Sequence, residues 1–262
     1  MKKLYIIAIS GNIMDDQEKL NNFLLDFSQL RGNKILVHGG GNAANQICEK
    51  LDVEPLLTKG KRGSDQNTLK VITMVYAGLI NKNIVARLQS NQCNAIGLTG
   101  MDANIIPTLT NENDSKGFSG QVDSNTINIS VINALLEKEL IPVLAPISHD
   151  GKGNLTDINP DTLASELAVS FTDLYEVQLI YCFEKKGVLK DISDANSVIP
   201  VITLDNYHQL KKEGVIAEGM TPKLDRAFNA LDRKVKSVRI CAADKLLNTV
   251  NSPERVGTEL FV

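Results

Sequence analysis

The sequence is poor in cysteine, and its cysteines form no C-x-x-C pair. The four residues, Cys48, Cys93, Cys182 and Cys241, are far apart along the 262 residues of the chain. This spacing suggests neither a zinc site nor a disulfide framework, so we expect the protein in a reducing cytoplasm.

The sequence also lacks an excess of charge of either sign. Its 28 basic and 31 acidic residues give a net charge of −3. Proteins that bind nucleic acid or an anionic membrane carry a basic surface, so neither partner is expected.

Long hydrophobic runs are missing as well. The apolar run 4–9 follows Lys2 and Lys3 but is too short for a signal peptide, and no stretch approaches the roughly 18 apolar residues of a membrane span. We therefore expect a soluble cytoplasmic protein without a membrane partner.

What the sequence does contain is ordinary for a globular protein. Hydrophobic residues make up 43% and charged residues 23%, with 18 Gly and 8 Pro. The whole chain should therefore fold, as one large domain or two small ones.

Apolar strand patterns and helical periodicities alternate along nearly the whole chain. This alternation predicts an α/β protein, a three-layer αβα sandwich around a mostly parallel sheet, with ligands at the carboxyl ends of the strands. The prolines at 142 and 146 place their strand near element ends or at an edge. Strands are predicted at 4–9, 34–37, 95–98, 141–147, 177–183, 237–240 and 259–262, and helices at 15–30, 43–51, 64–89, 125–138, 161–171, 203–212 and 222–232.

A run of three glycines, Gly39-Gly40-Gly41, follows the second predicted strand and precedes a helix. Glycines let backbone N–H groups approach a ligand, and the helix adds its positive end, so the turn suits a phosphate or a carboxylate. The segment is neither a dinucleotide fingerprint nor a Walker motif. A tight turn that needs glycine for steric reasons is the alternative, and His38 is interpreted as a turn or packing residue.

Other loops of similar character lie at 10–12, 61–64, 159–161 and 218–223. Lys223 is the most informative residue among them, because a cation in the first turn of a helix opposes the helix dipole and suggests a nearby anion. Simpler interpretations stay open: Arg62 in a surface ion pair, Asp161 as a helix cap and Lys223 as a solvated side chain.

Taken together, these segments resemble the amino acid kinase family, and within it the N-acetylglutamate kinases of arginine biosynthesis. The resemblance covers essentially the whole chain. It is carried, in order, by Val37-His38-Gly39-Gly40-Gly41, Asn81-Lys82, Gly97-Leu98-Thr99-Gly100, Asn159-Pro160-Asp161, Lys186-Gly187-Val188-Leu189 and Gly219-Met220-Thr221-Pro222-Lys223-Leu224.

The resemblance implies a carbamate kinase-like fold and transfer of the γ-phosphoryl group of ATP to the side-chain carboxylate of N-acetyl-L-glutamate or another N-acyl-L-glutamate, with Mg²⁺ bound with the nucleotide. It implies an N-terminal lobe, residues 1–174, for N-acylglutamate binding and dimerisation, and a C-terminal lobe, 175–262, for ATP. Arginine-inhibited members carry an extra N-terminal helix, whereas here the first strand begins by Leu4, so an arginine-insensitive homodimer is expected.

The resemblance also assigns site residues, and none of them is a direct metal ligand. Lys223, Asp161 and Gly11 would be catalytic. Gly40, Gly41, Arg62 and Asn159 would bind the substrate, and Lys186, Gly187, Gly219 and Met220 would bind the nucleotide.

The sequence departs from the family pattern in two places: at positions 8 and 10, and at Phe183-Glu184-Lys185-Lys186, where the family often has a Ser/Thr-Asp pair before the glycine near the nucleotide. Ala8 stands where a lysine usually contacts the transferring phosphoryl group, and Ser10 replaces the first glycine of the phosphate-facing turn. Lys185 or Lys186 would have to replace the missing charge. The alternatives are a catalytically impaired ligand-binding or regulatory paralogue, and a kinase for another acceptor such as carbamate, aspartate, free glutamate or a nucleotide.

Overall fold

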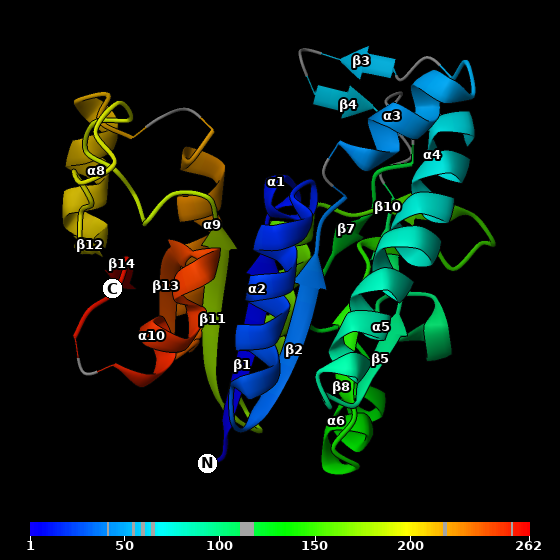
Figure 1. The fold of residues 1–262 in the computed structure, drawn as a ribbon, viewed down its shortest axis with the longest axis horizontal. Coiled ribbons are helices and arrows are strands. Elements are labelled where there is room, and N and C mark those ends of the chain that lie inside the picture. The colour runs from blue at the N-terminus through cyan, green and yellow to red at the C-terminus, as the bar shows by residue number, and fades with distance from the viewer. Residues whose placement is uncertain are drawn as a thin grey trace.

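An eight-stranded sheet forms the centre of the molecule (Figure 1). The computed structural model describes residues 1–40, 42–53, 56–58, 61–63, 66–110, 118–216, 219–252 and 254–262. Neighbouring strands of this sheet are parallel except for β13 and β14. Its order is β12 (Val201–Thr203), β14 (Thr258–Phe261), β13 (Ser237–Ala242), β11 (Glu176–Phe183), β1 (Lys3–Ile9), β2 (Asn33–His38), β8 (Ile141–Leu144) and β5 (Ala95–Leu98).

Both faces of the sheet are covered. Along β1, Leu4 and Ile6 belong to one buried cluster and Tyr5 and Ile7 to another, because successive side chains of a strand point to opposite faces. A continuous apolar strand is therefore required here, as the sequence predicted. The three-layer αβα architecture is confirmed.

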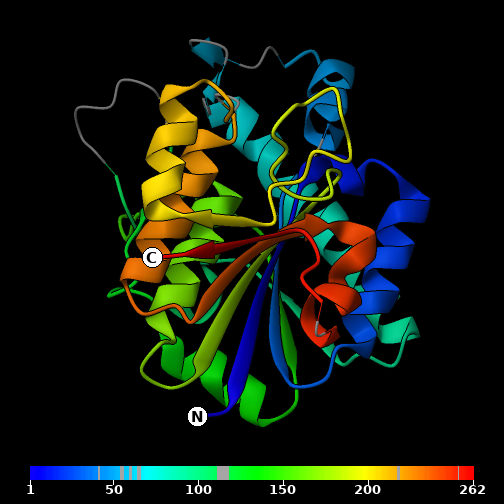
Figure 2. The ribbon, with the colours of Figure 1, turned by 90° about the vertical axis from the view of Figure 1, so that its left-hand side faces the viewer.

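Two helical layers enclose the sheet, which Figure 2 shows between them. Helices α6 to α9 pack on the face that carries Leu4, and the remaining helices pack on the face that carries Tyr5. The first layer contains α6 (Ile129–Glu137), α7 (Pro160–Ser170), α8 (Leu204–Lys212) and α9 (Thr221–Asp232). The second contains α2 (Gln17–Gln29), α3 (Ala43–Lys50), α4 (Gln66–Thr73), the π-helix η1 (Met74–Ile80), α5 (Asn81–Ser90) and α10 (Leu246–Asn251).

The helical run Gln66–Ser90 was predicted as one helix, but its middle, η1, is a π-helix. By length and composition alone the run could also cross a membrane. The run is not an unbroken apolar stretch, because Lys70, Asn81 and Lys82 interrupt it. Leu69, Ile72, Ile84 and Leu88 of this run are buried in the core, and 39% of its apolar window is buried.

The predicted strand 141–147 is two strands. β8 ends at Leu144, and β9 (Ile147–His149) forms a separate hairpin with β10 (Leu155–Asp157). The edge position suggested by Pro142 is wrong, because β8 lies between β2 and β5. Pro142 is tolerated near the start of the strand, since β2 pairs with β8 only from Val143 onward.

The short elements were not predicted, because few residues carry their signal. They are α1 (Gly11–Met14), the β3 (Leu56–Thr58) and β4 (Lys61–Gly63) hairpin, the β6 (Thr108–Leu109) and β7 (Gln121–Val122) pair, the strands β10 and β12, the helix α10, and the 3₁₀ turns η2 (Asp102–Asn104) and η3 (Ala243–Lys245).

Candidate active site

Three turns predicted from the sequence meet at the carboxyl ends of β1 and β2, the upper end of the sheet in Figure 1. A Cβ atom placed on Gly39 would lie 3.6 Å from the amide nitrogen of Gly11 and 3.7 Å from Cγ of Pro160. The turn after β1, the turn after β2 and the start of α7 are therefore in contact.

Asn159 is the N-cap of α7. Its Oδ1 accepts hydrogen bonds from the backbone N–H groups of Asp161 at 3.0 Å and Thr162 at 3.1 Å. Such a cap stabilises the helix start by about 1 kcal/mol. The capping role considered for Asp161 therefore belongs to Asn159, and the Asp161 carboxylate is left for another partner.

That partner is Lys223, in the first turn of α9. Its Nζ lies 3.2 Å from Oδ1 of Asp161, and the two side chains are only 16% and 25% exposed. The solvated interpretation of Lys223 is therefore wrong. The ion pair joins the beginnings of α7 and α9, which are 62 residues apart in the chain.

Two aromatic rings that sequence analysis did not single out lie beneath this lysine. Nζ of Lys223 is 4.9 Å from the ring centre of Tyr181 and 5.0 Å from that of Phe183. An ammonium group over aromatic faces is stabilised as a cation. The two rings alternate along β11 and so share one face, which was the available signal.

Tyr181 also contacts the backbone of Asp161. Its hydroxyl donates to the backbone carbonyl of Asp161 at 3.3 Å. Burial raises the pKa of this hydroxyl, and the charge of Asp161 raises it further. Tyr181 therefore stays protonated and neutral beside the pair.

Gly40 lies directly against an aromatic ring. A Cβ atom at this position would come within 1.6 Å of Cε1 of Tyr76. The steric interpretation of the glycine turn therefore holds at Gly40, where only a hydrogen fits. It coexists with a binding role, because close packing also fixes the backbone.

The residues expected around the nucleotide lie in more open surroundings. No heavy atom of the described residues lies within 4 Å of where a Cβ of Gly219 would be, and Met220 precedes α9. Lys186 is exposed, and its Nζ donates to Oδ1 of Asn196 at 2.8 Å. Gly187 is instead packed tightly, since a Cβ there would lie 2.7 Å from Oγ1 of Thr258.

The two unusual positions of β1 are also in this region. Ala8 is buried and pairs with Tyr181 in the parallel ladder. Oγ of Ser10 is buried and has no hydrogen-bond partner among the described residues. A hydroxyl left in this state is destabilising unless a ligand satisfies it.

Two of the predicted substrate residues cannot be placed. Gly41 lies outside the described residues. The backbone of Arg62 is in β4, where it pairs with Leu57 of β3, but its side chain is outside the described part of the structure.

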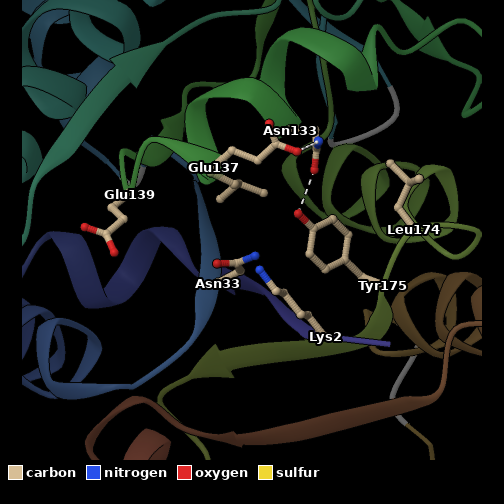
Figure 3. Close-up of a pocket in the computed structure, with 8 residues that line it drawn as sticks. Lys2, Asn33, Asn133, Glu137, Glu139, Leu174 and Tyr175 are labelled. Carbon is tan, nitrogen blue, oxygen red and sulfur yellow. Dashed lines mark hydrogen bonds between the residues drawn. The ribbon is translucent and has the colours of Figure 1, made fainter.

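A separate cavity of about 370 Å³ lies at the opposite end of the sheet (Figure 3). Lys2, Asn33 and Tyr175 line it, near the amino-terminal ends of β1, β2 and β11. Tyr175 donates a hydrogen bond of 2.6 Å to Oδ1 of Asn133 there. This cavity is therefore distinct from the candidate site.

Within the described ranges, no three His, Cys, Asp or Glu side chains gather closely enough to hold a metal ion. The cations and glycine turns of the site are instead suited to anionic ligands. A carboxylate and a phosphate chain are the groups that such an arrangement can hold side by side.

Comparison with known proteins places this geometry in a family. The acetylglutamate kinase of Cytophaga hutchinsonii is 51% identical over 99% of this chain and 99% of that protein, and the one of Phocaeicola vulgatus is 45% identical over 94% and 95%. The structure of carbamate kinase from Giardia lamblia bound to AMP-PNP has the same fold, with a TM-score of 0.73, 15% identity and coverage of 99% and 98%. Residues 3–242 match the amino acid kinase family, and the chain belongs to this family.

Proposed function

We propose that this protein transfers the γ-phosphoryl group of ATP to the side-chain carboxylate of N-acetyl-L-glutamate in arginine biosynthesis. A carboxylate oxygen attacks the γ-phosphorus, the bond to the bridging oxygen breaks, and ADP leaves with that electron pair. The acceptor is already ionised at neutral pH, so no general base is needed. Positioning and charge neutralisation carry the catalysis.

The observation that carries the proposal is the meeting of the Asp161–Lys223 ion pair with the turns at Gly11 and Gly39. Relatives that align over nearly the full chain are acetylglutamate kinases. The residue types that this reaction requires therefore occur together in a chain of the right family.

Lys223 and Asp161 have complementary roles in this proposal. Lys223 neutralises charge on the transferring phosphoryl group, and Asp161 holds the ammonium group in place. The rings of Tyr181 and Phe183 support the same position from below. A fixed cation needs no reorganisation as charge develops in the transition state.

The acceptor is held by the first part of the chain. Gly11, Gly40 and Gly41 offer N–H groups to the acceptor and the phosphoryl group, and Arg62 binds the α-carboxylate through its planar fork. Asn159 binds the remaining polar groups through its side-chain NH₂, which donates to none of the described residues, since only Oδ1 is used in the cap.

The nucleotide is held by the second part, through Lys186, Gly187, Gly219 and Met220. The exposed surroundings of Gly219 leave room for a phosphate chain. Mg²⁺ prefers oxygen ligands and comes with the phosphates, whose charge it would neutralise. Oδ2 of Asp161, which pairs with none of the described residues, fits that preference.

This division corresponds to an acceptor lobe, 1–174, and a nucleotide lobe, 175–262, joined where β1 pairs with β11. We also propose that the acceptor lobe forms a homodimer in the cytoplasm. Met74 and Leu79 support this, because they are 57% and 51% exposed on η1 and offer an apolar face. Sedimentation equilibrium should give about twice the 28.6 kDa monomer mass.

The alternative is a paralogue that binds these ligands with little turnover. Ala8 and Ser10 favour it, and the bond between Lys186 and Asn196 directs that lysine to the surface. Loss of one preorganised charge typically lowers the rate by a factor on the order of 10² to 10³.

The test is ATP-dependent acyl-phosphate formation, trapped as the hydroxamate, by wild type and Ala8→Lys. N-acetyl-L-glutamate, N-succinyl-L-glutamate and free glutamate are compared, and binding of each is recorded. We expect wild-type turnover with N-acetyl-L-glutamate. Binding without turnover, restored by Ala8→Lys, would favour the impaired paralogue, and turnover with another acceptor alone would replace the proposed substrate.

A further inference from the structure

A buried hydrogen-bond network lies behind the glycine turn. His38, the last residue of β2, is fully buried, and its Nδ1 is 2.8 Å from the carbonyl oxygen of Gly39. Its Nε2 is 3.0 Å from Nδ2 of Asn81, which also donates to the carbonyl of Val143 at 3.0 Å. The network thus connects β2, β8 and the start of α5.

Lys82 anchors the far side of this network. Its Nζ donates to Oδ1 of Asn81 at 3.3 Å and to the carbonyl of Gly97 at 2.9 Å. A Cβ atom on Gly97 would come within 1.9 Å of Oδ1 of Asn81, so this glycine makes room for the amide. The Asn81-Lys82 and Gly97 segments, which carried part of the family resemblance but were assigned no functional role, belong to one hydrogen-bond network.

These contacts fix the proton on His38. The acceptor at Val143 and the donor at Lys82 determine which end of the Asn81 amide is NH₂. Since that NH₂ can only donate, Nε2 of His38 accepts, and Nδ1 carries the hydrogen that it donates to Gly39. His38 is therefore a neutral donor with one orientation.

The bond to Gly39 determines the direction of the next N–H group. A trans peptide is planar, so the carbonyl of Gly39 and the N–H of Gly40 point in opposite directions. Because the carbonyl points to His38 in the core, the Gly40 N–H points away from it. In the proposed function that N–H contacts the acceptor.

The π-helix brings a second contact to the same turn. Tyr76 lies in η1 against Gly40, and Asn81, five residues later, begins α5. In an α-helix, residues five apart point about 140° away from each other. The i to i+5 bonding of a π-helix brings them to nearly the same side. The unusual helix geometry thus lets one helix fix two consecutive residues of the turn.

We propose that His38, held by Asn81 and Lys82, is a positioning residue that sets the direction of the Gly40 N–H in the acceptor site. The inference rests on the proposed function, because that function places the acceptor at Gly40. It predicts a defect in acceptor use and not in ATP use, since Gly187 and Gly219 lie outside the network.

The experiment compares His38→Leu, which removes both bonds, with His38→Asn, whose NH₂ is placed to keep the donor to Gly39. Tyr175→Phe is the matched control, because it loses the hydrogen bond from Tyr175 to Asn133, which Figure 3 shows at the other end of the sheet. The readouts are kcat, KM for each substrate, the calorimetric Kd for N-acetyl-L-glutamate and the unfolding temperature.

We expect His38→Leu to lower kcat/KM for the acceptor by about 100-fold, since small displacements of positioning groups cost that much. The kcat/KM of His38→Asn for the acceptor should be about tenfold higher than that of His38→Leu. The Kd for ATP should stay unchanged in both, and Tyr175→Phe should change only the unfolding temperature. The inference would be overturned if His38→Leu lowered kcat/KM equally for the acceptor and for ATP. It would also be overturned if His38→Leu lowered kcat/KM no more than Tyr175→Phe does.

Two further results keep the outcome clear. If His38→Leu fails to fold, the exposed Lys82→Met decides: an acceptor-specific loss of about threefold supports the inference, and unchanged constants refute it. If wild type binds N-acetyl-L-glutamate without turnover, the proposed function fails, but the Kd values of the His38 variants still test the inference about His38. If wild type does not bind it, both fail.

Discussion

The two sides of the candidate site are built differently. On the acceptor side, Gly40 is packed against Tyr76. His38 is buried in a hydrogen-bond network that fixes the direction of the Gly39 carbonyl. On the nucleotide side, Gly187 is packed against Thr258, but Lys186 is exposed and no described residue comes close to Gly219. The acceptor-side turn is therefore fixed by packing and hydrogen bonds, whereas the surroundings of Gly219 leave room for a ligand.

Lys223 is where the two sides meet, and its loss should have the largest effect. Lys223→Met should lower kcat by roughly 10² to 10³, because a preorganised cation is removed from the transferring group. Lys223→Arg should retain part of the rate, since it keeps the charge. Steady-state kinetics with saturating ATP and N-acetyl-L-glutamate measures both variants.

The matched control is Lys211→Met. Lys211 has the same kinds of partners, Asp225 at 3.5 Å and the ring of Tyr207 at 5.5 Å, but its side chain is 45% exposed and lies outside the site. We expect its kinetic constants to match wild type. Equal losses at Lys211 and Lys223 would mean that the lysine at the site acts only through folding.

Acid should weaken the acceptor side through His38. Burial lowers the pKa of His38 from 6.5 to about 4, and the charge of Lys82 adds to the effect. Between these values the unfolded chain binds a proton that the folded chain does not. The free energy of unfolding should therefore fall as pH drops from 6.5 to 4, by roughly 3 kcal/mol from this residue.

Urea unfolding at a series of pH values measures this effect as the difference between wild type and His38→Asn, which cannot titrate. The carboxylates contribute equally to both curves and cancel. Parallel curves across this range would show that His38 is not held neutral in the folded protein.

Replacing Gly40 and Gly219 with alanine tests directly whether the acceptor side is more tightly packed than the nucleotide side. Gly40→Ala must displace the ring of Tyr76, and such overpacking costs about 1 to 3 kcal/mol. Gly219→Ala meets no heavy atom of the described residues within 4 Å, so its unfolding free energy should match wild type while the KM for ATP rises. Similar destabilisation in both variants would remove the distinction between a shaped and an open side.

Much of this arrangement could be predicted from the sequence. The buried strands follow from unbroken apolar runs, and α2 follows from the helical spacing of residues such as Phe23 and Phe27. Lys223 was distinctive because a cation opposes the helix dipole. That Asp161 shares the catalytic site with it came from the family resemblance alone.

What could not be predicted depends on contacts between distant segments. Nothing in the composition of residues 74–80 indicates i to i+5 bonding, and the ring of Tyr76 meets Gly40 only once the chain has folded. His38 was interpreted correctly as a packing residue. Its hydrogen bond to Asn81, 43 positions away, is visible only in three dimensions.

The smallest predicted effect concerns Ser10, at the boundary between the two sides. Its buried Oγ has no partner in the described part of the chain, and such a hydroxyl costs about 1 to 3 kcal/mol. Ser10→Ala should therefore raise the unfolding free energy of the ligand-free protein by about 1 kcal/mol. ATP should abolish this gain, because its phosphates would accept the hydroxyl hydrogen in wild type.

Thermal unfolding with and without ATP measures the difference, and Ser170→Ala is the control. Oγ of Ser170 already donates to the carbonyl of Leu167 at 2.8 Å, so its removal should give no gain in either condition. If Ser10→Ala is stabilised equally with and without ATP, the hydroxyl does not face the phosphates. Ser10 would then destabilise the protein without a compensating contact to ATP. The proposal of an impaired paralogue would explain this sequence better than that of an active kinase.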